Sequence, residues 1–333
     1  MKKLTIAAVA AFALATGVAS AADIVTKGPR PVVVPDPPAW DLAFGSAVTN
    51  DYIFRGVTQS NHKPAVAAYF EPRYNFNKDH MLYAGIGGAS ISFPNRAAAE
   101  VDFYAGYRPT FGKLAFDFGA WYYYYPGGQC FSAIANGNTF DCSPSGGAAF
   151  QALPNGNAIK KDLSFYEIYG KVNWSVTDNF VLGAYAYYSP SVLNSGANGV
   201  FYGGTAKYTW AAWSNGVQPY ISAEVGRWSL GTSDSFYGLP GTNFAGGIPY
   251  ADYTTWNAGF GWTWKVFTVD LRYIDTNLNK GNCNAFTSDQ TAGIPGTTAN
   301  ITPINPTGVG SNWCSGVFTA RLSADLTINS NLK

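Results

Sequence analysis

The sequence predicts an all-β protein, a transmembrane antiparallel β-barrel of the outer-membrane type with about twelve strands. Three observations support this prediction. Segments of about 10 to 15 residues alternate between apolar and polar side chains. The connections between these segments are alternately short and long, and Trp and Tyr gather at the segment ends. A barrel in a membrane is expected to combine all of these features.

The composition excludes several other classes of protein. Only 12% of the 333 residues are charged, 16% are aromatic, and 21 Lys and Arg nearly balance 20 Asp and Glu. Intrinsic disorder requires low hydrophobicity and high net charge, and a coiled coil requires an excess of Glu, Lys and Leu. A nucleic-acid-binding protein is expected to carry a basic surplus, so no nucleic-acid partner is predicted.

Two segments precede the predicted barrel. Residues 1–21 begin with a basic Met-Lys-Lys, continue with an apolar run and end in Ala-Ser-Ala, which predicts a secretory signal peptide. A membrane anchor helix is disfavoured because the apolar run is too short to span a bilayer. Residues 22–39 are rich in proline, which favours extended geometry, and they are expected to form a periplasmic arm. The barrel is expected over residues 40–333.

The alternation places the strands along the chain. The connections after the even-numbered strands are short and those after the odd-numbered strands are mostly longer. This order is typical of a transmembrane barrel with both termini on the short-turn side. The expected strands are 40–54, 64–76, 81–93, 99–110, 114–126, 162–176, 180–189, 199–213, 218–230, 250–264, 266–277 and 315–328.

One face of each strand is apolar and the other carries the charges. In the fourth expected strand, Glu100, Asp102 and Arg108 alternate with Val101 and Phe103. The aromatic positions indicate that the apolar face points outward, because Trp and Tyr bands mark the two interfaces of a membrane. The expected bands are Trp40, Trp174, Trp210, Trp262 and Trp264 at the short turns, and Tyr122, Tyr124, Tyr187 and Tyr188 near the long loops.

The alternation fails in one strand. In 218–230, Ser222 and Glu224 differ in parity from Arg227 and Ser229. A β-bulge near Gly226 is expected to reconcile them, because an extra residue in one strand shifts the face of every residue after it.

The four cysteines fall in two of the long loops. Cys130 and Cys142 lie in one loop and Cys283 and Cys314 in another, so disulfides 130–142 and 283–314 are expected in an oxidising compartment. A metal site is disfavoured because no pair has the short spacing of metal ligands. No metal or other cofactor is predicted.

The inner face is expected to line a pore. It carries acids and bases together, so the side chains can neutralise one another, and strong ion selectivity is not implied. A permanently plugged lumen is the alternative, and several inward glycines favour a passage for small solutes. The expected pore-lining residues are Asp51, Glu71, Arg73, Glu100, Asp102, Arg108, Asp117, Glu167, Lys171, Lys207, Asp270, Arg272, Arg321 and Asp325.

Two arrangements could in principle support hydrolysis. His62 with Ser60 and Asp51 is the one candidate triad, but Ser-x-His in a loop is a weak signal. Glu100 and Asp102 share a face, as glycoside hydrolysis would require, but on a barrel wall they are better explained as lumen charges. An enzyme is therefore not expected.

The chain resembles a known bacterial family. The match begins with an opening block, residues 50–60, which is followed by Pro64-Ala65-Val66. Later blocks, such as Glu100-Val101-Asp102-Phe103-Tyr104, follow in the same order as in the family over roughly residues 44–188. These residues are similar to the TorF-type family of outer-membrane porin candidates, also described as conserved proteins of unknown function. The resemblance implies an outer-membrane location and a transport role. The opening block is Asn50-Asp51-Tyr52-Ile53-Phe54-Arg55-Gly56-Val57-Thr58-Gln59-Ser60.

The opening block also has a physical interpretation. Tyr52 and Phe54 are expected on the apolar outer face, and Gly56 lets the chain turn. Arg55 is either a ligand for an anionic solute at the lumen mouth or, as we prefer, a partner of Asp51 or of a loop carbonyl that fixes the first loop.

Together these observations predict an outer-membrane channel for passive passage of small polar solutes. The alternative is a structural or surface-binding barrel with a plugged lumen. Outer-membrane lipid and small solutes are the expected partners. Lipopolysaccharide or an extracellular protein could contact the long loops 127–161 and 278–314, which are rich in Gly, Asn, Thr and Ser.

Overall fold

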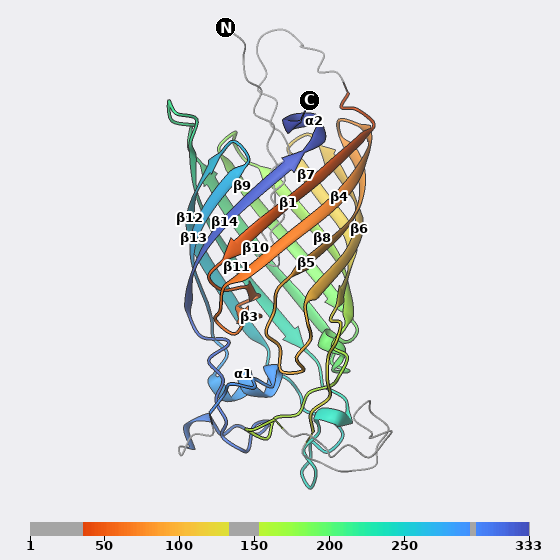
Figure 1. Ribbon diagram of the computed structural model, residues 1–333, viewed down its shortest axis with the longest axis vertical. Coiled ribbons are helices and arrows are strands. Elements are labelled where there is room, and N and C mark those ends of the chain that lie inside the picture. Colours follow the sequence, from red (N-terminus) through yellow and green to blue (C-terminus); the bar gives the residue numbers. More distant parts are fainter. Residues whose placement is uncertain (1–35, 133–152, 294–297, 333) are drawn as a thin grey trace.

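The computed structural model describes residues 36–132, 153–293 and 298–332. Twelve antiparallel strands close into one barrel, which confirms the predicted fold class (Figure 1). Residues 1–21 and most of 22–39 lie outside the described residues. The barrel strands are β1 (Trp40–Thr49), β4 (Ala65–Asn77), β5 (His80–Ala89), β6 (Glu100–Phe111), β7 (Leu114–Tyr124), β8 (Phe165–Ser175), β9 (Phe180–Ser189), β10 (Gly199–Thr209), β11 (Gln218–Leu230), β12 (Tyr253–Trp264), β13 (Phe267–Thr276) and β14 (Val317–Thr327).

The apolar and charged faces of the barrel wall are reversed relative to those of a soluble protein. Large apolar side chains on the outer face are exposed, including Val66 at 60% and Phe318 at 74%. Glu71, Glu100 and Glu167 on the inner face are at most 2% exposed. Successive side chains of a strand point to opposite faces, so the alternation of the sequence becomes an apolar exterior and a charged interior. Among the described helices, none is long and apolar enough to cross a membrane.

The two ends of the barrel differ. The "short-turn end" carries brief connections such as 78–79 and 265–266, and the "long-loop end" carries the connections after β1, β5, β7, β9, β11 and β13. Trp40, Trp174, Trp210 and Trp264 are exposed at the short-turn end, and Tyr122, Tyr124 and Tyr188 are exposed toward the long-loop end. Tyr187 was expected in this outer band, but its ring packs inside the barrel against Phe201.

The expected bulge near Gly226 is wrong. β11 pairs with β10 and with β12 in uninterrupted register, so Ser222 and Glu224 both face inward. Arg227 faces outward instead and pairs with Asp252 at the rim, where N and O lie 3.2 Å apart. The wall therefore tolerates an outward charge at its edge, where water is within reach. The irregularity among the described strands lies in β4, between Asn75 and Asn77.

The first strand is shorter than expected. β1 ends at Thr49, and the chain then forms β2 (Ile53–Phe54) and β3 (Val57–Thr58), a two-stranded hairpin that lies within the barrel near its long-loop end (Figure 1). The turn uses Arg55 and Gly56, both with positive φ, of 49° and 82°. A glycine is needed at the second position, because a Cβ there would lie 2.3 Å from a methyl carbon of Thr276.

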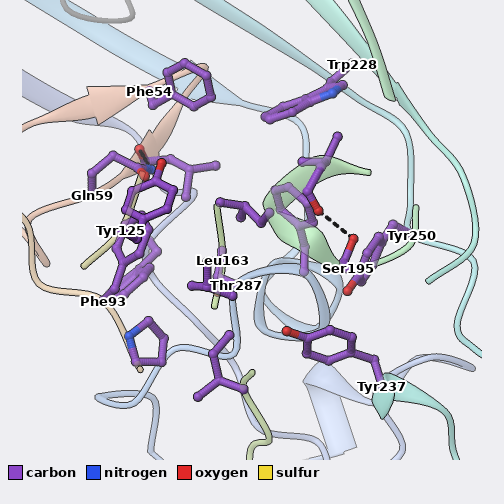
Figure 2. A pocket seen from close by; sticks show the side chains of 17 residues that line it. Phe54, Gln59, Phe93, Tyr125, Leu163, Ser195, Trp228, Tyr237, Tyr250 and Thr287 are labelled. Atoms are coloured by element: carbon purple, nitrogen blue, oxygen red, sulfur yellow. Dashed lines mark hydrogen bonds between the residues drawn. The ribbon is translucent and has the colours of Figure 1, made fainter. Parts of the chain in front are cut away.

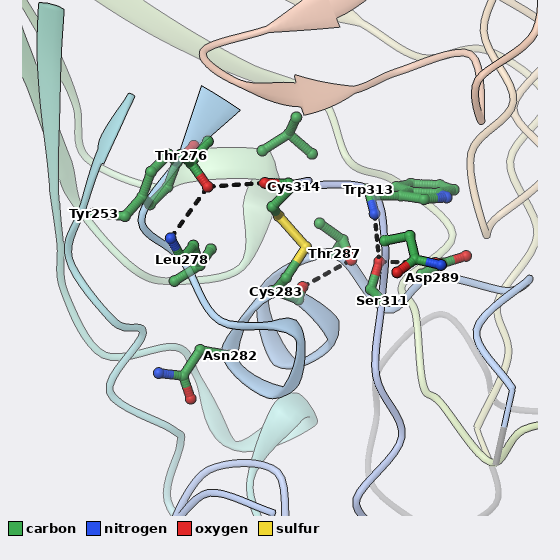
Figure 3. Close-up of a disulfide and its surroundings, with 12 residues drawn as sticks. Tyr253, Thr276, Leu278, Asn282, Cys283, Thr287, Asp289, Ser311, Trp313 and Cys314 are labelled. Carbon is green, nitrogen blue, oxygen red and sulfur yellow. Dashed lines mark hydrogen bonds between the residues drawn. A yellow bond between two sulfur atoms is a disulfide. The ribbon is translucent and has the colours of Figure 1, made fainter. Parts of the chain in front are cut away.

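The loops at the long-loop end contain their own short elements. The expected long loop 278–314 contains a helix, α1 (Lys280–Thr287), and its Cys283 is joined to Cys314 as expected (Figure 3). The expected partner of Cys130, Cys142, lies outside the described residues. The remaining short elements are η1 (Val192–Asn194), η2 (Ser235–Tyr237), η3 (Thr298–Asn300) and the terminal α2 (Ile328–Asn331).

Candidate functional site

A hairpin formed by the first loop crosses the barrel interior. We call residues 51–60 the first-loop hairpin. It is rooted between β1 and β4, and the order of strands in the ring places β9 and β10 on the opposite side. Its tip nevertheless contacts Tyr187 of β9 and Phe201 of β10. The hairpin thus spans the lumen from one wall to the other.

The tip of the hairpin is anchored by an ion pair. Both terminal nitrogens of Arg55 donate to Glu167 of β8, each over 2.7 Å, and the two side chains are 3% and 1% exposed. A two-pronged bond of this kind fixes orientation as well as adding energy. Burial lowers the pKa of the Arg55 guanidinium, but the charge and hydrogen bonds of Glu167, together with Tyr123 and Tyr187, raise the net pKa above its ordinary value.

Aromatic rings enclose the same guanidinium. The Arg55 Cζ atom lies 4.9, 4.4 and 4.5 Å from the ring centroids of Tyr187, Phe201 and Trp228. Phe54 of the hairpin itself is also 4.5 Å away. These distances are within the range of cation–π attraction. We call Glu167, Tyr187, Phe201 and Trp228 the guanidinium pocket.

The expectations for the opening block are corrected by this arrangement. Arg55 pairs with Glu167 rather than with Asp51 or a loop carbonyl. Tyr52 and Phe54 do not lie on the outer face: Tyr52 is 5% exposed, and Phe54 packs edge-to-face on Tyr123. The physical reason is that the chain leaves the wall after Thr49, so the alternation of the following residues belongs to an internal hairpin.

The root of the hairpin is held by a buried carboxyl group, that of Glu100. Tyr52 and Tyr125 donate to the two oxygens of Glu100 over 2.5 and 2.9 Å. Asp102 lies on the same inner face and is 1% exposed, and its Oδ1 has no hydrogen-bond partner in the described structure. Neither carboxyl group forms an ion pair with a described residue. Glu100 therefore works here as an acceptor that positions the first loop.

Asp51 closes the base of the loop. Its Oδ1 accepts from Thr58 over 2.6 Å and from Ser60 over 3.0 Å, and its Oδ2 lies 2.7 Å from His62 Nδ1. The other ring nitrogen of His62 faces the carbonyl of Asn312 at 3.3 Å. The candidate triad is thus brought together, but Ser60 bonds to the carboxylate and not to His62. A nucleophile is activated by a base beside it, whereas these three side chains converge on the Asp51 carboxylate, so we describe the cluster as a latch that closes the base of the loop.

The latch predicts a dependence on pH. The hydrogen bond to Asp51, partly opposed by burial, raises the pKa of His62 above its usual 6.5. The contribution of His62 is fully present below that usual value and is lost as the pH rises through the raised pKa. Hydrogen exchange of residues 51–64, corrected for intrinsic rates, should therefore show stronger protection at about pH 6 than at about pH 8.5.

The control for this prediction is the other histidine of the chain. His80 lies at the short-turn end, so His80→Gln should keep the pH dependence and His62→Gln should remove it. Equal protection of the first loop at both pH values in the wild-type protein would contradict the latch.

Beyond the hairpin, the inner wall carries a first network of paired charges. Glu71 is 0% exposed and accepts from Arg73 over 2.6 Å and from Arg108 over 2.9 Å. Arg108 also reaches Asp117 at 3.3 Å, and Tyr83 donates to Asp117 over 2.5 Å. Predicted residues from β4, β6 and β7 are thus joined into one neutralised group.

A second network lies on the other side of the barrel. Arg272 pairs with Asp270 at 2.9 Å and donates to Ser222 over 2.8 Å. Tyr220 donates to Asp270 over 2.6 Å. Lys207 lies 4.2 Å from the centroid of the Tyr220 ring. Both signs of charge are therefore held in place along the wall.

The other predicted residues also lie on the inner face. Lys171 is 4.6 Å from the centroid of the Tyr169 ring, and Asp325 accepts from Tyr69 over 3.1 Å. Arg321, four residues before Asp325 in β14, has the same parity. Among the described residues no group of three or more His, Cys, Asp or Glu is placed to hold a metal ion.

Sequence reasoning missed several residues of this interior. Glu224 faces inward, accepting from Tyr185 over 2.5 Å and from Asn257 over 3.0 Å, but it was left out because the face of its strand was uncertain. Glu224 has the same parity as Ser222, and this signal could have assigned Glu224 to the inner face. The rings of Phe201 and Trp228 were also missed, since apolar residues on an inner face have no signal of their own.

A small cavity separates the hairpin from the long loops. Its volume is about 50 Å³, and Figure 2 shows Phe54, Gln59 and Trp228 on its walls, opposite Tyr237 and Tyr250. The lining is mostly apolar, with aromatic and aliphatic side chains together. Trp228 lines both this cavity and the guanidinium pocket, so the two are adjacent and share this side chain.

Comparisons with known proteins find one matching family and several solved structures of similar fold. The profile of a family described as "Bacterial protein of unknown function (Gcw_chp)" matches residues 36–302. No curated protein matches the chain. Similar solved structures include the NanC porin, at 10% identity and a TM-score of 0.39, covering 86% of this chain and 98% of that one.

Two further structures are similar at the same level. The COG4313 outer membrane channel from Pseudomonas putida F1 is 9% identical with a TM-score of 0.37, covering 91% of this chain and all (100%) of that one. LpxR from Salmonella typhimurium is 10% identical with a TM-score of 0.38, covering 86% and 99%.

Proposed function

The chain belongs to the Gcw_chp family of bacterial proteins of unknown function, and we propose that it is an outer-membrane channel for small polar solutes that the first-loop hairpin closes. One observation carries this proposal. The hairpin crosses the lumen, but it contributes no strand to the wall, because β1 pairs directly with β4 and with β14. Withdrawal of the hairpin would leave the ring of strands intact.

The chemistry of the inner wall supports a hydrated path. Charged side chains occur from Glu167 near the long-loop end to Arg108 near the short-turn end, and most are already paired. Paired charges of both signs offer hydrogen bonds to a polar solute without creating a strong barrier to either sign of ion. The proposed channel is therefore weakly selective for charge.

The outer wall supports a membrane location. Its exposed apolar side chains, bordered by Trp at one end and Tyr at the other, match a lipid-facing band between two interfaces. The signal peptide predicted over residues 1–21 implies that the protein is exported, which agrees with this proposed location. Outer-membrane lipid is then the partner of the outer wall, and small solutes are the partners of the lumen.

Single-channel recording tests the proposal. We expect the purified wild-type protein to conduct little in a planar lipid bilayer. Replacement of residues 52–59 by a Gly-Ser linker should give steady conductance. The matched control replaces the exposed residues 240–243 with the same kind of linker, which should leave conductance at the wild-type level.

A negative result would favour the alternative. If the hairpin-replaced protein keeps heat-modifiable mobility on a gel but does not conduct above the lipid background, the lumen is plugged by the wall itself. The protein would then be a structural or surface-binding barrel that works through its long loops.

A further inference from the structure

We propose that the guanidinium pocket is a binding site for guanidinium solutes, which Arg55 occupies as an internal ligand. This inference rests on the proposed channel function and specifies the class of solute that it favours. The pocket belongs to the wall, since Glu167 lies on β8, Tyr187 on β9, Phe201 on β10 and Trp228 on β11. It remains when the hairpin leaves.

The carboxylate of Glu167 matches the shape of a guanidinium group. Each of its oxygens accepts from a different terminal nitrogen of Arg55, over the same 2.7 Å. A planar guanidinium presents parallel N–H groups in the fork that a carboxylate accepts, whereas an ammonium ion is a compact point charge. The site therefore favours a guanidinium compound over an amine of similar length.

The aromatic rings add a second criterion for the ligand. Tyr187, Phe201 and Trp228 come from three neighbouring strands and all lie within 5 Å of the Arg55 Cζ atom, with 4.9 Å the longest distance. A delocalised cation stacks on such faces and is less strongly hydrated than an ammonium ion. A neutral urea group of the same shape would lose both the ion pair and the cation–π attraction.

The pocket is held in place by contacts that do not involve the hairpin. Tyr123 of β7 donates to Glu167 over 3.2 Å. The ring of Phe201 stacks on Tyr185, with centroids 5.4 Å apart, and packs edge-to-face on Trp228 at 5.9 Å. A ligand would thus meet a site that is already formed, and ordering costs little affinity there.

The loss of Arg55 explains why a ligand would bind when the hairpin withdraws. With the hairpin docked, Glu167 is 1% exposed and Arg55 is its partner. Withdrawal takes this cation away, and a solute guanidinium would restore the two-pronged pair with Glu167. The solute would then compete with the tip of the hairpin, so its binding would favour the open state.

Calorimetry on the hairpin-replaced protein tests this inference. Residues 52–59 are replaced by a Gly-Ser linker, which leaves the pocket without Arg55. Agmatine and arginine are titrated as guanidinium probes, with citrulline as the neutral analogue and cadaverine as the amine control. We expect agmatine to bind more tightly than cadaverine and citrulline not to bind.

Two substitutions locate the binding. Glu167→Gln in the same background should weaken agmatine binding by about tenfold or more, because the charge-assisted pair is lost. Asp252→Asn, which changes a carboxylate at the rim, should leave it unchanged. If the Glu167→Gln barrel fails to fold, Phe201→Leu serves instead and should weaken agmatine more than cadaverine. Equal binding of agmatine and cadaverine would overturn the inference.

The outcome is separable from that of the channel proposal. Conductance of the hairpin-replaced protein without agmatine binding would keep the channel and reject the guanidinium site. Agmatine binding that Glu167→Gln abolishes, without conductance, would keep the site and reject the channel.

Discussion

Arg55→Ala is expected to convert the protein from a closed to a conducting barrel. The substitution leaves Glu167 buried without its cation, and breaking a buried ion pair in this way costs about 3–5 kcal/mol. A change of this size shifts the population of undocked hairpin by roughly a hundredfold or more. The anchors at Asp51 and Tyr52 lie at the root of the hairpin. At the tip, the hydrogen bond from Tyr253 to the carbonyl of residue 55 remains, over 3.1 Å, and one such bond contributes only about 0.5–1.5 kcal/mol. Single-channel conductance and hydrogen exchange of the hairpin would measure the shift.

The partner substitution and a double variant refine this test. Glu167→Gln should also open the barrel. The double variant Arg55→Met with Glu167→Leu should be more tightly closed than either single variant, because no charge is left buried. Arg227→Ala removes an outward rim pair and should change nothing. If Arg55→Ala conducts no more than the wild-type protein, the ion pair does not hold the hairpin in place.

Glu71→Gln is expected to destabilise the wall itself. The side chain keeps its shape but loses the charge that neutralises Arg73 and Arg108, whose side chains are 10% and 23% exposed, whereas Glu71 itself is 0% exposed. Two largely buried guanidinium groups would then share Asp117 as the carboxylate of the first network. We expect a loss of about 3–5 kcal/mol in the free energy of unfolding, measured by urea titration in detergent.

The control for Glu71 is the Lys78–Asp79 pair at the short-turn end. Its atoms are 3.9 Å apart and its side chains are 60% and 44% exposed. Lys78→Ala should therefore change the free energy of unfolding by less than about 1 kcal/mol. If Glu71→Gln had an unfolding midpoint as high as that of Lys78→Ala, the first network would contribute no more than a surface pair.

The sequence could predict the wall because the wall is a local property. Alternation along each strand and the order of loop lengths are visible without knowing which strands meet. The hairpin could not be predicted in this way. Residues 50–54 were predicted to continue the alternation of β1, and the anchor of Arg55 lies 112 residues further along the chain. The departure of the chain from the wall after Thr49 is decided by that distant contact.

The sequence could predict which charged side chains lie on the inner face, but not which of them pair with one another. Strand charges such as Glu71 and Asp270 were assigned to the inner face by parity alone. Tyr187 was misassigned because Tyr occurs on both faces of β9, at 185 and 187 inside and at 188 outside, so no contrast in polarity separates the two faces. Arg227 caused the opposite error. Its charge suggested the inner face, but it lies on the outer face at the rim, where a charged side chain contacts water.

The long sequence separation of the hairpin from its pocket also bears on folding order. Arg55 reaches Glu167 only after the strands between them have paired, and its aromatic neighbours extend to Trp228 on β11. Contacts so distant in sequence form late, because the entropy of closing the intervening chain must be overcome first. We therefore expect the tip of the hairpin to dock late in folding, after β8 to β11 have joined the barrel.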